Sequence, residues 1–247
     1  MLQIKQLCLR YRNGRYALAD FNLTVKGGEL VIVLGGNGSG KTTLLRCINR
    51  TLVPTTGEVW LNGTNITDIH GEQLRRARLQ LAMISQRSSL VWRRSVLSNV
   101  ATGALGRHFN AWTAIGGFPT EELRAAHGYL TQVGLTGLGQ QRAGTLSGGQ
   151  AQRVAIARAL AQKPTVLLAD EPVASLDPEA ADEIMRLLRH LAADENLAVL
   201  CVLHQVELAY AYADRVIGIR DGRMAFDLPR AKVSRDDVKR LYNAEAA

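Results

Sequence analysis

The chain has 247 residues, of which 47% are apolar and 21% charged, enough for one large α/β domain or two small ones and for a substantial core. No apolar run approaches the roughly 18 residues needed to cross a bilayer, and residues 1–5 lack the features of a secretory signal, so we expect a cytoplasmic protein. The net charge is +8 and arginines cluster between Arg75 and Arg107, but no run of consecutive basic residues with interleaved aromatic residues appears, which disfavours a nucleic-acid groove and leaves a solvated face or a surface that meets a membrane or partner.

The first part of the chain is predicted to be rich in β-strands. Alternating apolar and polar residues indicate strands at 2–9 and 21–25, and residues 57–63 form a strand closed by an Asn-Gly turn. Residues 30–34 are apolar throughout, as in a strand buried on both faces, and a glycine-rich loop and a helix at 41–52 follow. We therefore expect antiparallel strands packed on the edge of a larger sheet.

The remainder of the chain changes from helical to alternating patterns. After a short strand at 82–85, helical periodicity predominates, and we interpret residues 88–160 as an inserted helical subdomain. Strands and helices then alternate, which predicts a mostly parallel sheet covered by helices on both faces. The predicted elements are strands at 166–169, 198–203 and 216–219, helices at 178–193, 206–213 and 233–242, and a hairpin closed by Asp221-Gly222.

The glycine-rich loop has the P-loop pattern, in which Gly35 is followed after four residues by Gly40-Lys41-Thr42. Its glycines allow successive main-chain N–H groups to point at phosphate oxygens, and the following helix adds a positive N-terminus. We expect Lys41 to reach the β- and γ-phosphates and the hydroxyl of Thr42 to bind Mg²⁺. The sequence thus predicts that ATP is bound by residues Gly35, Gly36, Asn37, Gly38, Ser39, Gly40, Lys41, Thr42 and Thr43.

Two acidic residues, Asp170 and Glu171, end the strand at 166–169. The carboxyl ends of parallel strands face the ligand crevice, so Asp170 is placed to hold the metal. Glu171 is predicted to polarise the water that attacks the γ-phosphate. The three cysteines (Cys8, Cys47 and Cys201) are far apart in apolar surroundings, which predicts buried thiols rather than disulfides or a zinc site.

The chain resembles the ATPase subunits of ABC transporters over almost its whole length. Residues 146–150 (Leu-Ser-Gly-Gly-Gln) resemble that family's signature, and the chain also carries counterparts of its Q-loop glutamine, D-loop, switch histidine and adenine-stacking aromatic residue, at Gln86, 175–177, His204 and Tyr11. The implied fold is a mostly parallel α/β core with an N-terminal antiparallel β subdomain and an inserted helical subdomain. Tyr16 competes with Tyr11 for the stacking role.

The resemblance also implies roles for these residues. Gln86 would bring its amide to Mg²⁺ and the attacking water, and His204 would donate to the γ-phosphate. In a head-to-tail dimer, a second copy would cap the nucleotide from the far side. The residues expected to act in trans are Ser147, Gly148, Gly149, Gln150 and Asp177. The residues expected to be catalytic are Lys41, Gln86, Glu171 and His204.

Several less specific segments are similar to the ATPases of phosphonate importers. They are 95–106, Trp112, 118–119, 169–178, 203–209, 212–218 and 226–227. At Gly36-Asn37 the chain departs from the Pro-Ser that is usual in importer P-loops. The resemblance implies an ATP hydrolase that drives uptake of phosphonates or related compounds, such as phosphite or phosphonate esters.

The implied partners are a second copy of the chain, transmembrane permease subunits contacted by residues 86–105, and indirectly a periplasmic solute-binding protein. The protein would thus lie on the cytoplasmic face of the cell membrane. An importer ATPase for another small solute remains an alternative. An ABC ATPase acting on nucleic acid is disfavoured, because neither a coiled-coil insertion nor a second ATPase domain is present, and a P-loop phosphotransferase would lack the signature.

Overall fold

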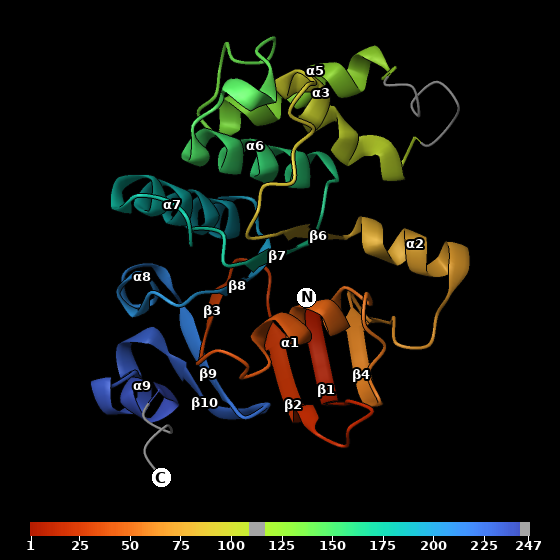
Figure 1. Cartoon of the computed structure of the whole chain (residues 1–247). Coiled ribbons are helices and arrows are strands. Elements are labelled where there is room, and N and C mark those ends of the chain that lie inside the picture. Colours follow the sequence, from red (N-terminus) through yellow and green to blue (C-terminus); the bar gives the residue numbers. More distant parts are fainter. Residues whose placement is uncertain (109–116, 243–247) are drawn as a thin grey trace.

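The computed structural model describes residues 1–108 and 117–242, so Trp112, one of the residues that resemble phosphonate importers, lies outside the described residues. The N-terminal strands form a separate antiparallel sheet (Figure 1), in the order β2-β1-β4-β5. Its strands are β1 (Leu2–Arg10), β2 (Tyr16–Val25), β4 (Thr56–Leu61) and β5 (Thr64–Asn65). The turn between β4 and β5 has positive φ at Asn62 and Gly63, as the Asn-Gly pair predicts.

A second sheet forms the centre of the molecule, in the order β10-β9-β3-β8-β7-β6. All neighbouring strands pair in parallel except the hairpin of β9 and β10. The strands are β3 (Leu30–Leu34), β6 (Leu81–Ile84), β7 (Val166–Asp170), β8 (Ala198–Val202), β9 (Arg215–Arg220) and β10 (Arg223–Pro229). Because five strands run in one direction, the loops that follow β3, β6, β7 and β8 emerge at the same edge.

Helices surround this sheet (Figure 1). Those between β6 and β7 lie together at the top of the view: α3 (Val96–Ala101), α5 (Thr120–Gln132), α6 (Gly148–Ala161) and the short 3-10 helices η1 (Thr102–Gly106) and η2 (Ala143–Thr145). The others are α1 (Lys41–Ile48), α2 (Gly71–Leu79), α7 (Pro178–Asp194), α8 (Val206–Tyr212), η3 (Arg230–Lys232) and α9 (Arg235–Tyr242). Within the described ranges, no helix has the length and apolar character needed to span a membrane.

The central sheet separates two apolar cores. Along β3, Leu30, Ile32 and Leu34 pack into a core shared with α7 and with the helices between β6 and β7, which include α6. Val31 and Val33 face the other core, which is formed with the antiparallel sheet and α1. Since both faces of the strand are covered, its sequence is apolar without alternation.

The fold class predicted from the sequence is confirmed, with differences in detail. Helix α1 ends at Ile48 instead of residue 52, and Arg50 beyond it has a positive φ of 56°. Helix α2 was missed by the sequence analysis because it is strongly polar and buries only Ala77 among its nine residues, so it lacks an apolar stripe. The division into a core and a helical subdomain at 88–160 stays a prediction.

Candidate nucleotide-binding site

The P-loop joins β3 to α1, and its glycines occupy positions where larger residues would clash. A Cβ on Gly35 would lie 2.3 Å from the main-chain oxygen of Ile219. Gly40 caps α1 with a φ of 109°, and a Cβ there would lie 2.5 Å from the oxygen of Ala17. The P-loop can therefore follow this close path along neighbouring strands only with glycine at these two positions.

Lys41 is buried at the start of α1, with 5% of its surface exposed. Its Nζ donates to the oxygens of Gly35 at 2.8 Å and Gly36 at 2.9 Å, so the ammonium lies across the loop. Burial lowers the pKa of Lys41, and the charges of Glu171 and Asp170 oppose that effect. In the described part of the chain, the buried Oγ of Ser39 has no hydrogen-bond partner, which leaves a donor for an anionic ligand inside the loop.

A cavity of about 420 Å³ opens beside the P-loop. Its walls include Tyr11 and Tyr16, which are 48% and 49% exposed, so both candidates for adenine stacking reach it. The hydroxyls of Tyr11 and Thr43 are 3.4 Å apart, and the guanidinium of Arg10 lies over the Tyr16 ring at 5.4 Å. The lining residues are Tyr11, Asn13, Arg15, Tyr16, Ala17, 37–43 and Glu171. Of these, Asn13, Arg15 and Ala17 were not predicted, because no motif marks them.

Asp170 and Thr42 lie together although they are far apart in the sequence. The hydroxyl of Thr42 donates to Oδ1 of Asp170 at 3.3 Å, because β7 ends beside the start of α1. Burial raises the pKa of Asp170, and this effect is larger than that of the Thr42 hydrogen bond, which lowers the pKa. Hydroxyl and carboxylate oxygens are the ligands that Mg²⁺ prefers, so the two side chains fit a magnesium site.

Glu171 follows Asp170 in a left-handed conformation, with a φ of 51°. Its main-chain N–H donates to the oxygen of Val202 at 3.1 Å, and its Oε1 lies 2.6 Å from Nε2 of His204. Such a conformation is uncommon for a residue with a side chain and persists where surrounding structure holds it. The ends of β7 and β8 thus bring Glu171, which lines the cavity beside the P-loop, together with His204.

Gln86 lies in the loop after β6, at the same edge of the sheet, and is exposed. It is not among the residues that line the cavity at the P-loop. Because β6 pairs with β7, Gln86 follows the strand next to the one that ends in Asp170.

The signature residues are located elsewhere. Ser147 caps α6: its Oγ accepts from the N–H of Gln150, whose Oε1 accepts from the N–H of Ser147. A Cβ on Gly148 or Gly149 would lie 3.3 Å from Leu176 or 3.1 Å from Ala180. The signature therefore packs beside the start of α7, and none of its residues lines the cavity at the P-loop.

Asp177, predicted to act in trans with the signature, caps α7 instead of contacting the P-loop. Its carboxylate accepts from the N–H of Ala180 at 2.9 Å, and its side chain is exposed. One copy of the chain thus brings together Lys41, Thr42, Asp170, Glu171 and His204 but not the residues expected in trans.

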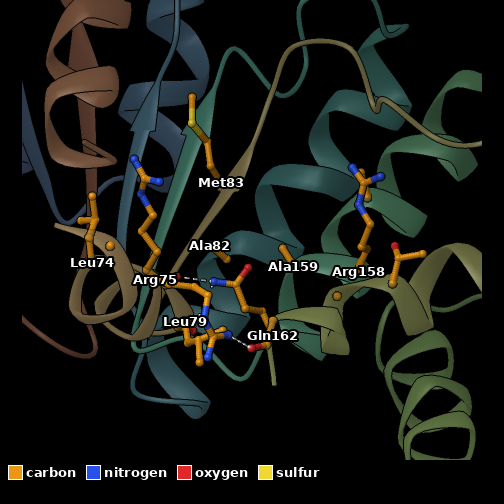
Figure 2. A pocket seen from close by; sticks show the side chains of 14 residues that line it. Leu74, Arg75, Leu79, Ala82, Met83, Arg158, Ala159 and Gln162 are labelled. Atoms are coloured by element: carbon orange, nitrogen blue, oxygen red, sulfur yellow. Dashed lines mark hydrogen bonds between the residues drawn. The ribbon is translucent and has the colours of Figure 1, made fainter. Parts of the chain in front are cut away.

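A second cavity, of about 570 Å³, lies between α2, β6, η1 and α6 (Figure 2). Its lining includes the apolar residues Leu74, Leu79 and Met83 and the cations Arg75, Arg78 and Arg158. Gln162 connects its walls, because its amide donates to the oxygens of Arg78 at 2.6 Å and Leu81 at 3.0 Å. No sequence motif indicated this cavity.

The chain is similar to many known proteins. The family description "ABC transporter" matches residues 18–174. The phosphonates import ATP-binding protein PhnC 1 of Ruegeria sp. is 44% identical over 243 residues, which cover 98% of this chain and 94% of that protein. The phosphonates import ATP-binding protein PhnC of Wolinella succinogenes is 43% identical, covering 99% of this chain and 89% of that protein.

Solved structures agree with this similarity. A dimeric, post-hydrolysis structure of the ATP-binding cassette MJ0796 with ADP and phosphate has a TM-score of 0.80 and 31% identity, covering 93% of this chain and 99% of its own. CbiO1 of Clostridium perfringens, part of an ABC transporter complex, has a TM-score of 0.84 and 30% identity, covering 99% of this chain and 95% of its own. The P-loop, the acidic strand end and the signature thus occur in a chain that belongs to the ABC transporter family, as one of its ATP-binding proteins.

Proposed function

We propose that the chain hydrolyses ATP to drive the import of phosphonates or related phosphorus compounds. The observation that carries the ATPase function is the convergence of Lys41, Thr42, Asp170, Glu171 and His204 at one edge of the sheet. The substrate class is supported by relatives named for phosphonate import that are similar over nearly the full length of the chain.

In this proposal, ATP lies along the P-loop. The main-chain N–H groups of residues 35–43 and the ammonium of Lys41 bind its phosphates, and Tyr11 or Tyr16 stacks on adenine. Thr42, Asp170 and Gln86 would hold Mg²⁺. The chemistry that this ion supplies when bound is neutralisation of charge on the β- and γ-phosphate oxygens.

Glu171 acts as the general base. Its carboxylate accepts a proton from a water placed in line with the γ-phosphate, and His204 fixes the direction of that carboxylate through its 2.6 Å contact. The left-handed main chain at Glu171 supports this role, because it turns the side chain out of the strand toward His204. In this proposal, His204 also donates a hydrogen bond to the γ-phosphate.

The proposed site is completed by a second copy of the chain. The N-terminus of α6, with Ser147, Gly148, Gly149 and Gln150, would bind the γ-phosphate held by the partner, and Asp177 would lie beside it. A 14-residue helix has a positive N-terminus that favours an anion. The separation of the signature from the P-loop in one copy supports a site shared between two.

A permease segment at the cytoplasmic face of the membrane is proposed to dock against residues 86–105 and the adjoining cavity in Figure 2, whose lining includes Thr102 and Gly103 of that range. The cavity combines apolar side chains with three arginines, so it fits an amphipathic helix that carries an acidic residue. A periplasmic binding protein would act through the permease, and nucleic acid is not a proposed partner.

The proposal is tested by deleting the gene in its source cell and supplying methylphosphonate as the sole phosphorus source. The wild-type gene should restore growth and a gene encoding Glu171→Gln should not, while both strains grow on phosphate. Full growth of the deletion strain on methylphosphonate would contradict the substrate class. Purified protein without ATPase activity at any Mg²⁺ concentration would contradict the proposed reaction.

A further inference from the structure

The guanidinium of Arg158 joins helix α6 to the loop that contains Gln86. Its Nη1 donates to the oxygen of Ser89 at 2.8 Å, and its Nη2 donates to the oxygen of Ser88 at 2.7 Å. Burial lowers the pKa of Arg158, so the cation lies partly out of water against these main-chain oxygens. A planar guanidinium presents two parallel N–H groups, which suits two successive carbonyl oxygens better than a single ammonium does.

The loop is held in an uncommon shape where Arg158 binds it. Ser89 has a φ of 49°, in the left-handed region, and its hydroxyl donates to the oxygen of Arg87 at 3.1 Å. The hydroxyl of Ser85 donates to the same oxygen at 2.7 Å. The segment from Ser85 to Ser89, which includes Gln86, is therefore a closed turn whose far end is fastened to α6.

Helix α6 is a rigid connection between this turn and the signature. It begins at the Ser147 cap and continues without interruption to Ala161, and Val154 and Ile156 are fully buried in the core. Arg158 is eleven positions after Ser147, which corresponds to about 16 Å along a helix. A Cβ on Gly103 would lie 2.0 Å from the oxygen of Arg158, so η1 also packs directly against this turn of α6.

We propose that Arg158 is a positioning residue that makes the Gln86 loop and the signature helix move as one body. A chain that binds its own ATP through Gln86 would then set the position of the signature that it presents to the second copy. The two ATP sites of the dimer would bind cooperatively through this link. The inference rests on the proposed roles of Gln86 and Ser147.

The test compares the full-length chain with Arg158→Gln, which removes the charge and the paired donors. ATP hydrolysis is measured against ATP concentration, and binding of a fluorescent ADP analogue is measured separately. We expect kcat to fall by about tenfold or more and the Hill coefficient, at most about 2 for two sites, to approach 1. The Kd for the ADP analogue should change by less than about twofold, because a diphosphate lacks the γ-phosphate, and the attacking water to which Gln86 is proposed to bring its amide lies in line with that group.

Two further variants separate positioning from a general loss of structure. Arg158→Lys keeps the charge but not the paired donors, and should be intermediate in both kcat and Hill coefficient. Arg76→Gln is the matched control, because Arg76 is an arginine of α2 in an exposed pair with Glu72. It should leave the kinetics unchanged. A melting temperature that falls for Arg158→Gln while the Hill coefficient stays at the wild-type value would overturn the inference.

A double-mutant cycle with Gln86→Ala tests whether Arg158 acts through the Gln86 loop. Linked residues should give effects on kcat that fall short of the sum of the single effects, whereas independent residues add. Additive losses would therefore sink the inference even if each variant is impaired. Wild-type turnover of Gln86→Ala would instead count against the proposed role of Gln86, and the separate roles of Lys41 and Glu171 would stand.

Discussion

Nε2 of His204 lies 2.6 Å from Oε1 of Glu171, within one chain and at the ends of two neighbouring parallel strands. The side chains are 36% and 19% exposed, so both remain accessible at this edge of the sheet, and Glu171 also lines the P-loop cavity. In the proposed reaction, this pair joins the carboxylate that activates water to the group that fixes the direction of that carboxylate. This relationship, more than either residue alone, supports the proposed hydrolysis.

Replacing His204 by alanine should remove the group that orients Glu171. We expect kcat to fall on the order of a hundredfold, because a positioned proton acceptor contributes this much or more. The Kd for ADP should change little, since a diphosphate lacks the γ-phosphate to which His204 is proposed to donate and His204 does not line the P-loop cavity. Steady-state kinetics and equilibrium binding, measured on the same preparation, test this prediction. An unchanged kcat would count against the pairing of His204 with Glu171.

Lys41→Ala should abolish useful binding of ATP. The ammonium lies across the loop on the oxygens of Gly35 and Gly36, where no other described side chain donates to them. Its loss removes the cation that would meet the β- and γ-phosphates. Isothermal titration with ATP and Mg²⁺ measures the effect, with Arg76→Gln as the control. Wild-type affinity would refute the assignment of this loop.

Asp170→Asn should stabilise the nucleotide-free protein at neutral pH. Burial raises the pKa of Asp170, so the ionised carboxylate opposes folding, and that cost disappears as the pH falls below its ordinary pKa of 3.8. Asparagine still accepts from Thr42 but carries no charge. The difference in melting temperature between variant and wild type should be positive near pH 7 and shrink toward pH 4. A lower melting temperature for the variant at pH 7 would contradict this explanation.

Thiol reagents should leave Cys47 and Cys201 unmodified in the folded protein at neutral pH. Burial raises the pKa of Cys47 to about 11 and raises the pKa of Cys201 further, so thiolate is scarce at both. Cys8 is partly exposed and should react first. Mass spectrometry after brief alkylation, with and without denaturant, measures this, and labelling of Cys201 under native conditions would be the contrary result.

Most residues of the candidate site could be assigned from the sequence because they follow local patterns. The P-loop is a short contiguous segment, and its glycines are required by contacts with Ala17 and Ile219 that a Cβ would obstruct. Asp170 and Glu171 could be placed because parallel strands bring their carboxyl ends to one edge. Arg15, which also lines the cavity, carries no such pattern, since only the packing of the β1–β2 turn beside the P-loop puts it there.

The sequence alone determined most of the strand and helix order, although not α2, together with the P-loop pattern and the acidic strand end, because hydrophobic period and glycine spacing act over short distances. Only the tertiary structure decided which distant groups meet: His204 with Glu171, Thr42 with Asp170, and Arg158 with the main chain of Ser88 and Ser89. These contacts depend on how whole helices and strands pack against one another. No local sequence pattern links α6 to β6, so the orientation of that helix against that strand could not be predicted.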